Sequence, residues 1–264
     1  MVDLKPPVKG QGYEGVLKGI DEFMAHSVRS HHPGFNNPIW GGWNPAAFAG
    51  ELIAATTNTS MYTYELAPMA SLIELELITK QCELAGLPEG SSGVLTTGGS
   101  NGNMMAMLCA RQKMFPDCLH KGSDGTKLVA YVSEESHYSV IMSANVIGIG
   151  YDNCVKVKAD KNGKMCMIAL EQEIEKTKAA GKTPFIVIAT CGTTVRGQYD
   201  PIRAISAICK KDNIWMHCDG AWGGSILLSR KHRVQMDGCE LADSICWDAH
   251  KLMGVPLICA SFLI

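Results

Sequence analysis

The chain has 264 residues and a formal net charge of −2, and 46% of its residues are hydrophobic. This length suits one large α/β domain or two small ones, and the composition supports a substantial core. No basic block or acidic tail occurs, so we expect neither nucleic acid nor a membrane as a partner. Residues 1–7 lack the apolar core of a signal peptide, and no run of 18 apolar residues predicts a membrane span.

Cysteine and histidine usage indicates the compartment and argues against a metal. The eleven cysteines are scattered, several fall in predicted core segments, and no CxxC pair occurs. We interpret them as reduced thiols, which is typical of a cytoplasmic protein. None of the eight histidines has a His/Cys spacing that makes a zinc site, so we expect no metal.

The N-terminal part is rich in proline and glycine. Residues 1–20 are predicted to form an irregular arm and residues 31–42 a loop, whose His31 and Trp40 either pack the loop or border a ligand. A helix with apolar spacing begins at Pro68 and closes at Gly86-Leu87-Pro88. We therefore divide the chain into an N-terminal arm and loop, residues 1–45, and a large domain, residues 46–264.

Strands and helices alternate through the large domain. Predicted strands cover residues 94–96, 128–133, 155–157, 185–190, 214–218, 244–247 and 257–263. Predicted helices cover residues 101–115, 136–146 and 169–179, and a further helix runs to about residue 211 from Asp200 and Pro201, taken as N-cap and first helical residue. Continuously apolar strands that alternate with helices predict an α/β fold with a mostly parallel sheet covered on both faces.

Polar side chains follow several of these strands, where ligands bind in open parallel sheets. Gly98-Gly99-Ser100 directly precedes a helix, so free N–H groups and the Ser100 hydroxyl can hold a phosphate, although such turns also occur for geometry alone. Asp219 ends an apolar strand, where an unpaired carboxylate is costly to bury. Lys251 follows another strand and offers an amine.

An anion site, a carboxylate and an amine at strand ends together indicate pyridoxal 5'-phosphate (PLP), whose phosphate, ring nitrogen and aldehyde need these partners. Ala221 leaves room for a flat ring, and His250 would fix the geometry of Lys251. His137 is either an ordinary histidine at a helix start or a ring that stacks on the cofactor. The hydroxyls of Thr193 and Thr194 either cap a turn or orient a ligand.

Several motifs occur in the same order and at the same intervals as in one known family of enzymes. They are Met61–Pro68 around Glu65, Thr97–Asn101, Ser136–Tyr138, Gly192–Thr194 followed by Asp200-Pro201, His217–Gly224, Ser229–Arg233 and Asp248–Lys251. Together they resemble the group II PLP-dependent amino-acid decarboxylases, which include glutamate, cysteine-sulfinate and aromatic amino-acid decarboxylases. The first two look nearest, and the resemblance runs from about residue 21 to the end.

The resemblance implies the PLP-dependent transferase fold type I, with a seven-stranded mixed sheet, one strand antiparallel, and the cofactor near a homodimer interface. It implies that Lys251 forms the Schiff base, Asp219 pairs with the ring nitrogen and His137 stacks on the ring. Gly99 and Ser100 would hold the phosphate, and Thr194 would lie near Asp219 and the ring. The further residues expected around the cofactor are Ala221, Asp248 and His250.

This sequence departs from the family in three places. Asp248 stands where many members have an asparagine near the phosphate, and an anion there repels unless it is protonated or bridged. Pro38 stands where the glutamate branch has a glutamine. The chain ends at Ile264, whereas members continue through a mobile loop and a small C-terminal domain, so we expect a fragment, a split gene or a truncated frame, with a separate C-terminal fragment as a possible partner.

These observations predict PLP-dependent decarboxylation of an L-amino acid that is small and acidic (glutamate, aspartate or cysteine sulfinate), with release of CO2 and an amine. Two alternatives stay open. One is another fold-type-I activity, either a transaminase or an aldol-type lyase. The other is a truncated, non-catalytic PLP-binding module.

Overall fold

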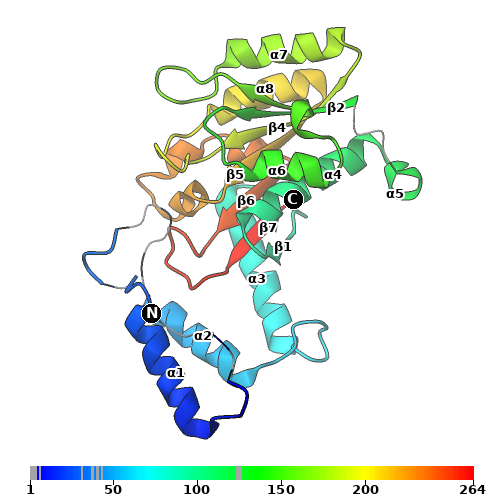
Figure 1. Ribbon diagram of the computed structural model, residues 1–264. Coiled ribbons are helices and arrows are strands. Elements are labelled where there is room, and N and C mark those ends of the chain that lie inside the picture. Colours follow the sequence, from blue (N-terminus) through cyan, green and yellow to red (C-terminus); the bar gives the residue numbers. More distant parts are fainter. Residues whose placement is uncertain are drawn as a thin grey trace. The chain divides into compact units, whose positions relative to one another are not determined.

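Figure 1 shows the computed structural model, which describes residues 5, 7–30, 32–36, 39, 42, 44–122 and 127–264. His31, Pro38 and Trp40 lie outside the described residues. The chain forms two compact units, residues 1–37 and residues 38–264.

The first unit contains a helix, α1 (Gly12–His26), where the sequence analysis expected an irregular arm over residues 1–20. That prediction is wrong for the helical part. Apolar side chains recur at helical spacing in this segment, at positions 13, 16, 17, 20, 23 and 24, and this periodicity outweighs the helix-weakening glycines at positions 15 and 19.

The second unit is built on a seven-stranded sheet with the strand order β1-β7-β6-β5-β4-β2-β3. The strands are β1 (Gly93–Thr96), β2 (Leu128–Ser133), β3 (Cys154–Val157), β4 (Thr183–Thr190), β5 (Trp215–Gly220), β6 (Ser244–Asp248) and β7 (Ala260–Leu263). Strand β7 is antiparallel to both β6 and β1, and the other neighbours are parallel. The expected mixed sheet with one antiparallel strand is confirmed.

Helices cover both faces of this sheet (Figure 1). The helices are α2 (Pro45–Thr57), α3 (Pro68–Ala85), α4 (Gly99–Met114), α5 (Cys118–Lys121), α6 (Ser139–Val146), α7 (Met167–Ala179) and α8 (Ile202–Asp212), with short 3-10 turns η2 (Tyr151–Asn153), η3 (Gly223–Leu228), η4 (Arg233–Met236) and η5 (Cys239–Leu241). Buried side chains of α4 and α6 join one apolar cluster, and those of α3, α7 and α8 join the other.

Burial on both faces explains why the strands read as continuous apolar runs. In β4, Ile186 and Ile188 pack into the cluster of α4 and α6, whereas Val187 and Ala189 pack into the cluster of α7 and α8. Successive side chains of a strand point to opposite faces, so the central positions 185–189 of β4 are all apolar. The sequence signal for a sheet between two helical layers is therefore confirmed.

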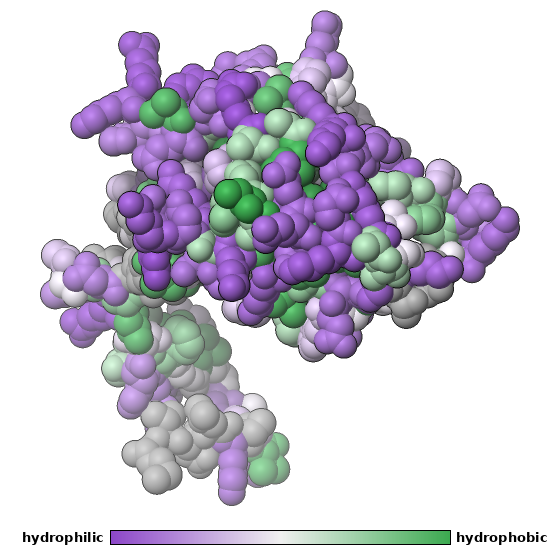
Figure 2. Space-filling model, turned by 90° about the horizontal axis from the view of Figure 1, so that it is seen from above, coloured by the Kyte–Doolittle hydropathy of each residue, from purple (hydrophilic) through white to green (hydrophobic). Residues whose placement is uncertain are grey.

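The outer surface over α7 is polar, in contrast to the apolar strands. It is mostly hydrophilic when the molecule is viewed from that side (Figure 2), and α7 carries the ion pairs Lys176–Glu173 and Lys178–Glu175 on this surface. Across the described residues, we find no helix that combines the length and the apolar character needed to cross a membrane.

Two predicted helix starts need correction. Helix α6 begins at Ser139 rather than at residue 136, so His137 lies in the turn that precedes the helix. Helix α8 begins at Ile202, and its N-cap is Pro201. The Asp200 carboxylate does not cap this helix, because it accepts the backbone N–H groups of Met165 (2.7 Å) and Thr190 (2.8 Å) and so ties two chain segments together. A carboxylate that accepts two buried N–H groups satisfies more polar atoms than a cap would.

The turn after β5 is closed by a glycine that no other residue can replace without movement. A Cβ on Gly223 would overlap the backbone oxygen of Cys191 and the hydroxyl of Tyr199. We predict that Gly223→Ala lowers the free energy of unfolding by about 1–3 kcal/mol, because a methyl group would be forced into a filled space. Urea unfolding measures this change.

Gly50→Ala is the matched control. Gly50 lies within α2, and a Cβ there would meet no atom within 4 Å. Removing a glycine from the interior of a helix should stabilise the protein by about 0.5–1 kcal/mol. Equal effects of the two substitutions would show that the turn after β5 has room for a side chain.

Candidate active site

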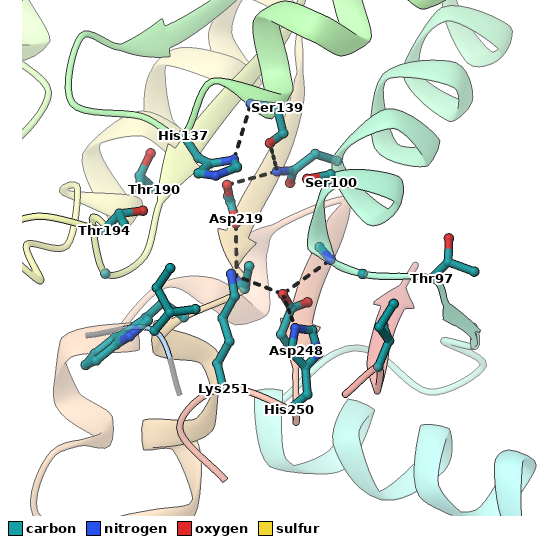
Figure 3. A pocket seen from close by; sticks show the side chains of 18 of the residues that line it. Thr97, Ser100, His137, Ser139, Thr190, Thr194, Asp219, Asp248, His250 and Lys251 are labelled. Atoms are coloured by element: carbon teal, nitrogen blue, oxygen red, sulfur yellow. Dashed lines mark hydrogen bonds and ion pairs between the residues drawn. The ribbon is translucent and has the colours of Figure 1, made fainter. Parts of the chain in front are cut away.

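A cavity of about 330 Å³ opens at the carboxyl edge of the sheet. Figure 3 shows side chains from the ends of several strands and from the start of α4 around it. All nine residues that the sequence analysis assigned to the site line this cavity, namely Gly99, Ser100, His137, Thr194, Asp219, Ala221, Asp248, His250 and Lys251. The structure thus brings together residues that are up to 152 positions apart in the chain, from Gly99 to Lys251 (251 − 99 = 152).

The start of α4 approaches the rest of the cavity very closely. A Cβ on Gly99 would lie 2.7 Å from the Cβ of Ala221 and 2.7 Å from Oδ2 of Asp248, so only glycine fits there. Gly98 has φ = 120°, a conformation that side chains disfavour. In the first turn of α4 the Gly99 N–H donates to Asp248 (3.2 Å) and the Asn101 N–H donates to the carbonyl oxygen of Gly98 (3.0 Å). The turn itself contains no acidic residue, so the Ser100 N–H and the exposed Ser100 side chain are the groups there that suit an anion.

Asp219 is 5% exposed and lies near the end of β5. Its Oδ2 accepts a hydrogen bond from Nδ2 of Asn103 (2.9 Å), and its Oδ1 accepts one from the N–H of Ala221 (3.2 Å). Among the described residues no cation pairs with it within 4 Å. A buried carboxylate held only by neutral donors is well suited to pair with a protonated ring nitrogen.

Asp248 is the second buried carboxylate, and its surroundings differ. It is 1% exposed, and its Oδ2 lies 3.2 Å from Nζ of Lys251, 3.2 Å from the N–H of Gly99 and 3.8 Å from Nε2 of His250. Burial raises the pKa of Asp248, although Lys251 acts in the opposite direction. Its Oδ1 is buried and has no hydrogen-bond partner among the residues that the structure describes.

The two cavity histidines have defined ring contacts. Nδ1 of His137 accepts the N–H of Ser139 (3.2 Å), so the neutral ring carries its hydrogen on Nε2. Burial lowers the pKa of His137 and favours this neutral form. Nδ1 of His250 lies 2.8 Å from the carbonyl oxygen of Cys259, and this contact joins the loop after β6 to the residue before β7.

The threonines near the end of β4 divide into three roles. Oγ1 of Thr193 accepts the N–H of Gln198 (3.1 Å), which is the turn role. Thr194 is exposed and lines the cavity. Thr190, which the sequence analysis did not assign, is paired in register with Asp219, lines the cavity and has a buried Oγ1 with no partner within the described part of the chain. The position of Thr190 as the last residue of an apolar strand is the sequence feature that could have indicated it as a cavity residue.

Asn103 and His217 were also missed. Asn103 is 1% exposed, lies one helical turn after Gly99 and donates to Asp219 and to Oγ of Ser139 (3.1 Å). His217 is fully buried, and burial lowers its pKa to about 4. It lies two residues before Asp219 and so shares its face of β5. A histidine inside an apolar strand, in phase with a carboxylate, was the signal that could have indicated it.

This sheet order, with a lysine and a carboxylate at the carboxyl edge, places the chain in the fold-type-I class of PLP-dependent proteins. The chain belongs to the pyridoxal-dependent decarboxylase family, because the model of the pyridoxal-dependent decarboxylase conserved domain matches residues 1–264. PLP is therefore the cofactor that the family implies.

Curated relatives and a solved structure agree with this family. The chain is 42% identical to cysteine sulfinic acid decarboxylase of Rattus norvegicus over 265 residues, and 43% identical to glutamate decarboxylase of Drosophila melanogaster over 264 residues. The crystal structure of mouse CSAD superposes with a TM-score of 0.96 at 41% identity and covers 99% of this chain. The chain spans about half the length of these relatives, 54% of the rat protein, 52% of the fly protein and 55% of mouse CSAD.

A bacterial structure extends the comparison. The glutamate decarboxylase domain of diaminobutyrate-pyruvate transaminase and L-2,4-diaminobutyrate decarboxylase from Vibrio parahaemolyticus superposes with a TM-score of 0.89 at 30% identity. It covers all of this chain and 58% of the bacterial one.

The residues present fit PLP. The close approach at Gly99 leaves a cradle that a Cβ would fill, and the unpartnered oxygens of Thr190 and Asp248 lie at the same cavity. Three groups of the cofactor need partners, and the cavity offers a candidate for each: the start of α4 for the phosphate, Asp219 for the ring nitrogen and Lys251 for the aldehyde.

The buried ring of His217 predicts a dependence of stability on pH. Its pKa is about 4 in the folded protein and 6.5 ordinarily, so the unfolded chain binds the proton first as the pH falls. Stability should therefore fall between pH 6.5 and pH 4, by about 3 kcal/mol at most from this residue. Urea unfolding at a series of pH values measures it.

His217→Gln should flatten this part of the curve, because the titrating ring is removed. His120→Gln is the control, since His120 is an exposed histidine outside the core. If the slope between pH 6.5 and pH 4 were the same in wild type and His217→Gln, this ring would not be the source of the acid sensitivity.

Proposed function

We propose that this chain is the cofactor-binding large domain of a PLP-dependent decarboxylase of small, acidic L-amino acids, with glutamate, aspartate and cysteine sulfinate as the candidate substrates. The reaction would release CO2 and leave an amine. The observation that carries this proposal is the arrangement of Lys251, Asp219 and His137 around one cavity at the carboxyl edge of the sheet. The named activities of the rat and fly relatives support the substrate class.

The cavity residues would hold PLP by three of its groups. The N–H groups at the start of α4 and the Ser100 hydroxyl would bind the phosphate, Asp219 would pair with the ring nitrogen, and Ala221 and His137 would lie against the ring. When bound, PLP supplies an electron sink for the electron pair left on the substrate's α-carbon. Thr190 and Thr194 offer hydroxyl groups to the ring substituents or to the substrate carboxylate.

Lys251 would supply the amine that binds the cofactor. An ammonium group must lose its proton before it can act as a nucleophile. Asp248 lies 3.2 Å from Nζ of Lys251, and burial raises the pKa of this carboxyl group, so it is placed to take up that proton. His250 would hold the loop that carries Lys251, residues 249–259, in place through its contact with the carbonyl oxygen of Cys259.

The proton that replaces the lost carboxylate would come from a group held near His137, because the neutral ring of His137 cannot give up its only N–H hydrogen without becoming an imidazolate. Nδ1 of His137 is occupied by the N–H of Ser139, and its Nε2 therefore carries the hydrogen. A group that replaces the lost carboxylate with a proton must reach the α-carbon from the cavity, and His137 lines that cavity.

We also propose a homodimer in the cytoplasm. All eleven cysteines are free and seven of them are buried, which suits a reducing compartment. Residues 69–77 of α3 include a series of exposed large apolar side chains that a second copy would cover, namely Met69, Leu72, Ile73, Leu75 and Leu77.

Labelling of the reactive lysine tests the cofactor site. Purified chain with added PLP should absorb near roughly 420 nm, a property of the lysine-bound cofactor. Borohydride should then fix PLP to Lys251, as located by peptide mass spectrometry. Lys231→Arg, at an exposed lysine outside the cavity, is the control and should leave the label unchanged. A label on another lysine would contradict the assignment.

Release of labelled CO2 from each candidate amino acid, in the complete protein, tests the activity. A 2-oxo acid product without CO2 would indicate a transaminase instead. Binding of PLP without turnover of any amino acid would indicate a non-catalytic module.

The charge at position 248 gives a prediction for cofactor affinity. Asp248 accepts the Gly99 N–H, beside the proposed phosphate site, and an anion there should repel the phosphate. Asp248→Asn keeps an oxygen for this N–H and removes the charge, so PLP should bind about tenfold more tightly, which is about 1.4 kcal/mol. The difference in PLP affinity between Asp248→Asn and wild type should shrink as the pH falls. The pKa of Asp248 is raised, so the wild-type carboxyl group takes up a proton and loses its charge.

Asp243→Asn is the control. Asp243 precedes β6, accepts the N–H of Met216 and pairs with Lys113, but it does not line the cavity. Fluorescence titration with PLP measures both variants. Weaker binding by Asp248→Asn would show that its ion pair with Lys251 matters more than its repulsion of the phosphate.

A further inference from the structure

A continuous chain of buried hydrogen bonds leads to Asp219 from the opposite end of β5. Nε1 of Trp215 donates to Oγ of Ser244 (2.9 Å), which lies 2.8 Å from Nδ1 of His217. Nε2 of His217 lies 3.0 Å from Oδ1 of Asn103, and Nδ2 of Asn103 donates to Asp219 (2.9 Å). All five residues are at most 8% exposed.

Strand geometry explains how these residues meet. Trp215, His217 and Asp219 alternate along β5 and so share one face. Ser244 is the register partner of His217 on β6, and Asn103 reaches the same face from α4. The described part of the chain thus contains a polar row inside an otherwise apolar layer, and buried polar rows must be satisfied at every atom.

The groups at the two ends of this hydrogen-bond chain, the Trp215 indole and the Asp219 carboxylate, fix the direction of every hydrogen bond between them. An indole N–H can only donate, so Ser244 accepts from Trp215 and has its own hydrogen to give to Nδ1 of His217. An ionised carboxylate can only accept, so Asn103 must turn its NH2 group toward Asp219 and its oxygen toward His217. The hydrogen of the neutral His217 ring must then lie on Nε2.

One competing arrangement is available. Nδ1 of His217 also lies 3.1 Å from the carbonyl oxygen of Ser244 and could donate to it. Nε2 would then lack a hydrogen, the Asn103 amide would turn over, and its oxygen would face Asp219. That contact is repulsive unless Asp219 is protonated, so the two directions of the chain correspond to two protonation states of Asp219.

We propose that Ser244, His217 and Asn103 are positioning residues that hold Asp219 in its ionised, ring-facing form by fixing the direction of this hydrogen-bond chain. The inference rests on the proposed pairing of Asp219 with the pyridine nitrogen of PLP. It assigns a role to Ser244, which does not line the cavity and is linked to Asp219 by three successive hydrogen bonds through His217 and Asn103.

The wild-type chain tests the inference without a cofactor. Nitrogen NMR of uniformly labelled protein reports which ring nitrogen of each histidine carries the hydrogen, and loss of one signal set in His217→Gln identifies this residue. We expect hydrogen on Nε2 at neutral pH. Hydrogen on Nδ1 would overturn the proposal, whether or not the chain binds PLP.

Ser244→Ala tests the effect on the site. It removes the hydroxyl hydrogen from Nδ1 of His217 and leaves the carbonyl of Ser244, so the ring should move its hydrogen to Nδ1 and the Asn103 amide should turn. We expect PLP to bind about five- to thirtyfold more weakly, as the loss of one to two kcal/mol implies. With nitrogen-labelled PLP, the ring nitrogen should also lose its proton at a lower pH than in wild type.

Ser225→Ala is the matched control. Oγ of Ser225 accepts the indole N–H of Trp247 (2.9 Å), as Ser244 does for Trp215, but nothing connects Ser225 to Asp219 among the described contacts. Both substitutions leave one buried indole unsatisfied and should destabilise the fold alike. Only Ser244→Ala should change the His217 tautomer and the protonation of PLP.

The outcomes separate the two claims. If wild type fails to bind PLP, the proposed function is wrong, and the His217 tautomer still decides the inference. If wild type binds PLP with a protonated ring nitrogen and Ser244→Ala matches Ser225→Ala in tautomer, affinity and protonation, the positioning role is wrong. If Ser244→Ala does not fold, the wild-type spectrum alone gives the answer.

Discussion

The common direction of the first six strands is the constraint on which this site depends. Because β7 is antiparallel to both of its neighbours, β1 and β6 run the same way, and so do β2 to β5. The residues that follow these strands must then meet at one edge of the sheet. The anion site, the buried carboxylate and the lysine lie around one cavity for this reason, although each comes from a different part of the sequence.

This constraint also explains how much the sequence could predict. Continuously apolar strands and polar residues at their ends are local signals, and they were enough to predict a mostly parallel sheet and cavity residues such as Gly99, Asp219 and Lys251. The antiparallel strand and the place of Asp248 were expected only from the resemblance to the decarboxylase family. The role of Asp200 could not be predicted from local signals, because its two donors, Met165 and Thr190, meet it only in the folded chain. Asn103 was missed for the same reason, since its partner Asp219 lies on another element. His217 was missed although its place two residues before Asp219 in an apolar strand was a local signal. In α1, glycine content was given more weight than periodicity, and periodicity decided the outcome.

The two buried carboxylates of the cavity, Asp219 and Asp248, have different surroundings. Asp219 is surrounded by neutral donors from Asn103 and Ala221, whereas Asp248 lies against the amine of Lys251. Their chemical group is the same, and only the second has a cation within reach among the described residues. Environments that differ in this way are what allow two like groups in one site to act differently at one pH.

The antiparallel strand β7 has a further consequence for the order in which the site forms. Asp248 and Ala260 pair in register, so the loop that carries Lys251 closes over only eleven residues, 249–259. Asn103 and Asp219, by contrast, meet across 116 positions. Closing the longer segment costs about 2 kcal/mol more chain entropy. The lysine loop is therefore set by a local hairpin, whereas the Asn103–Asp219 contact is made only when much of the chain is in place.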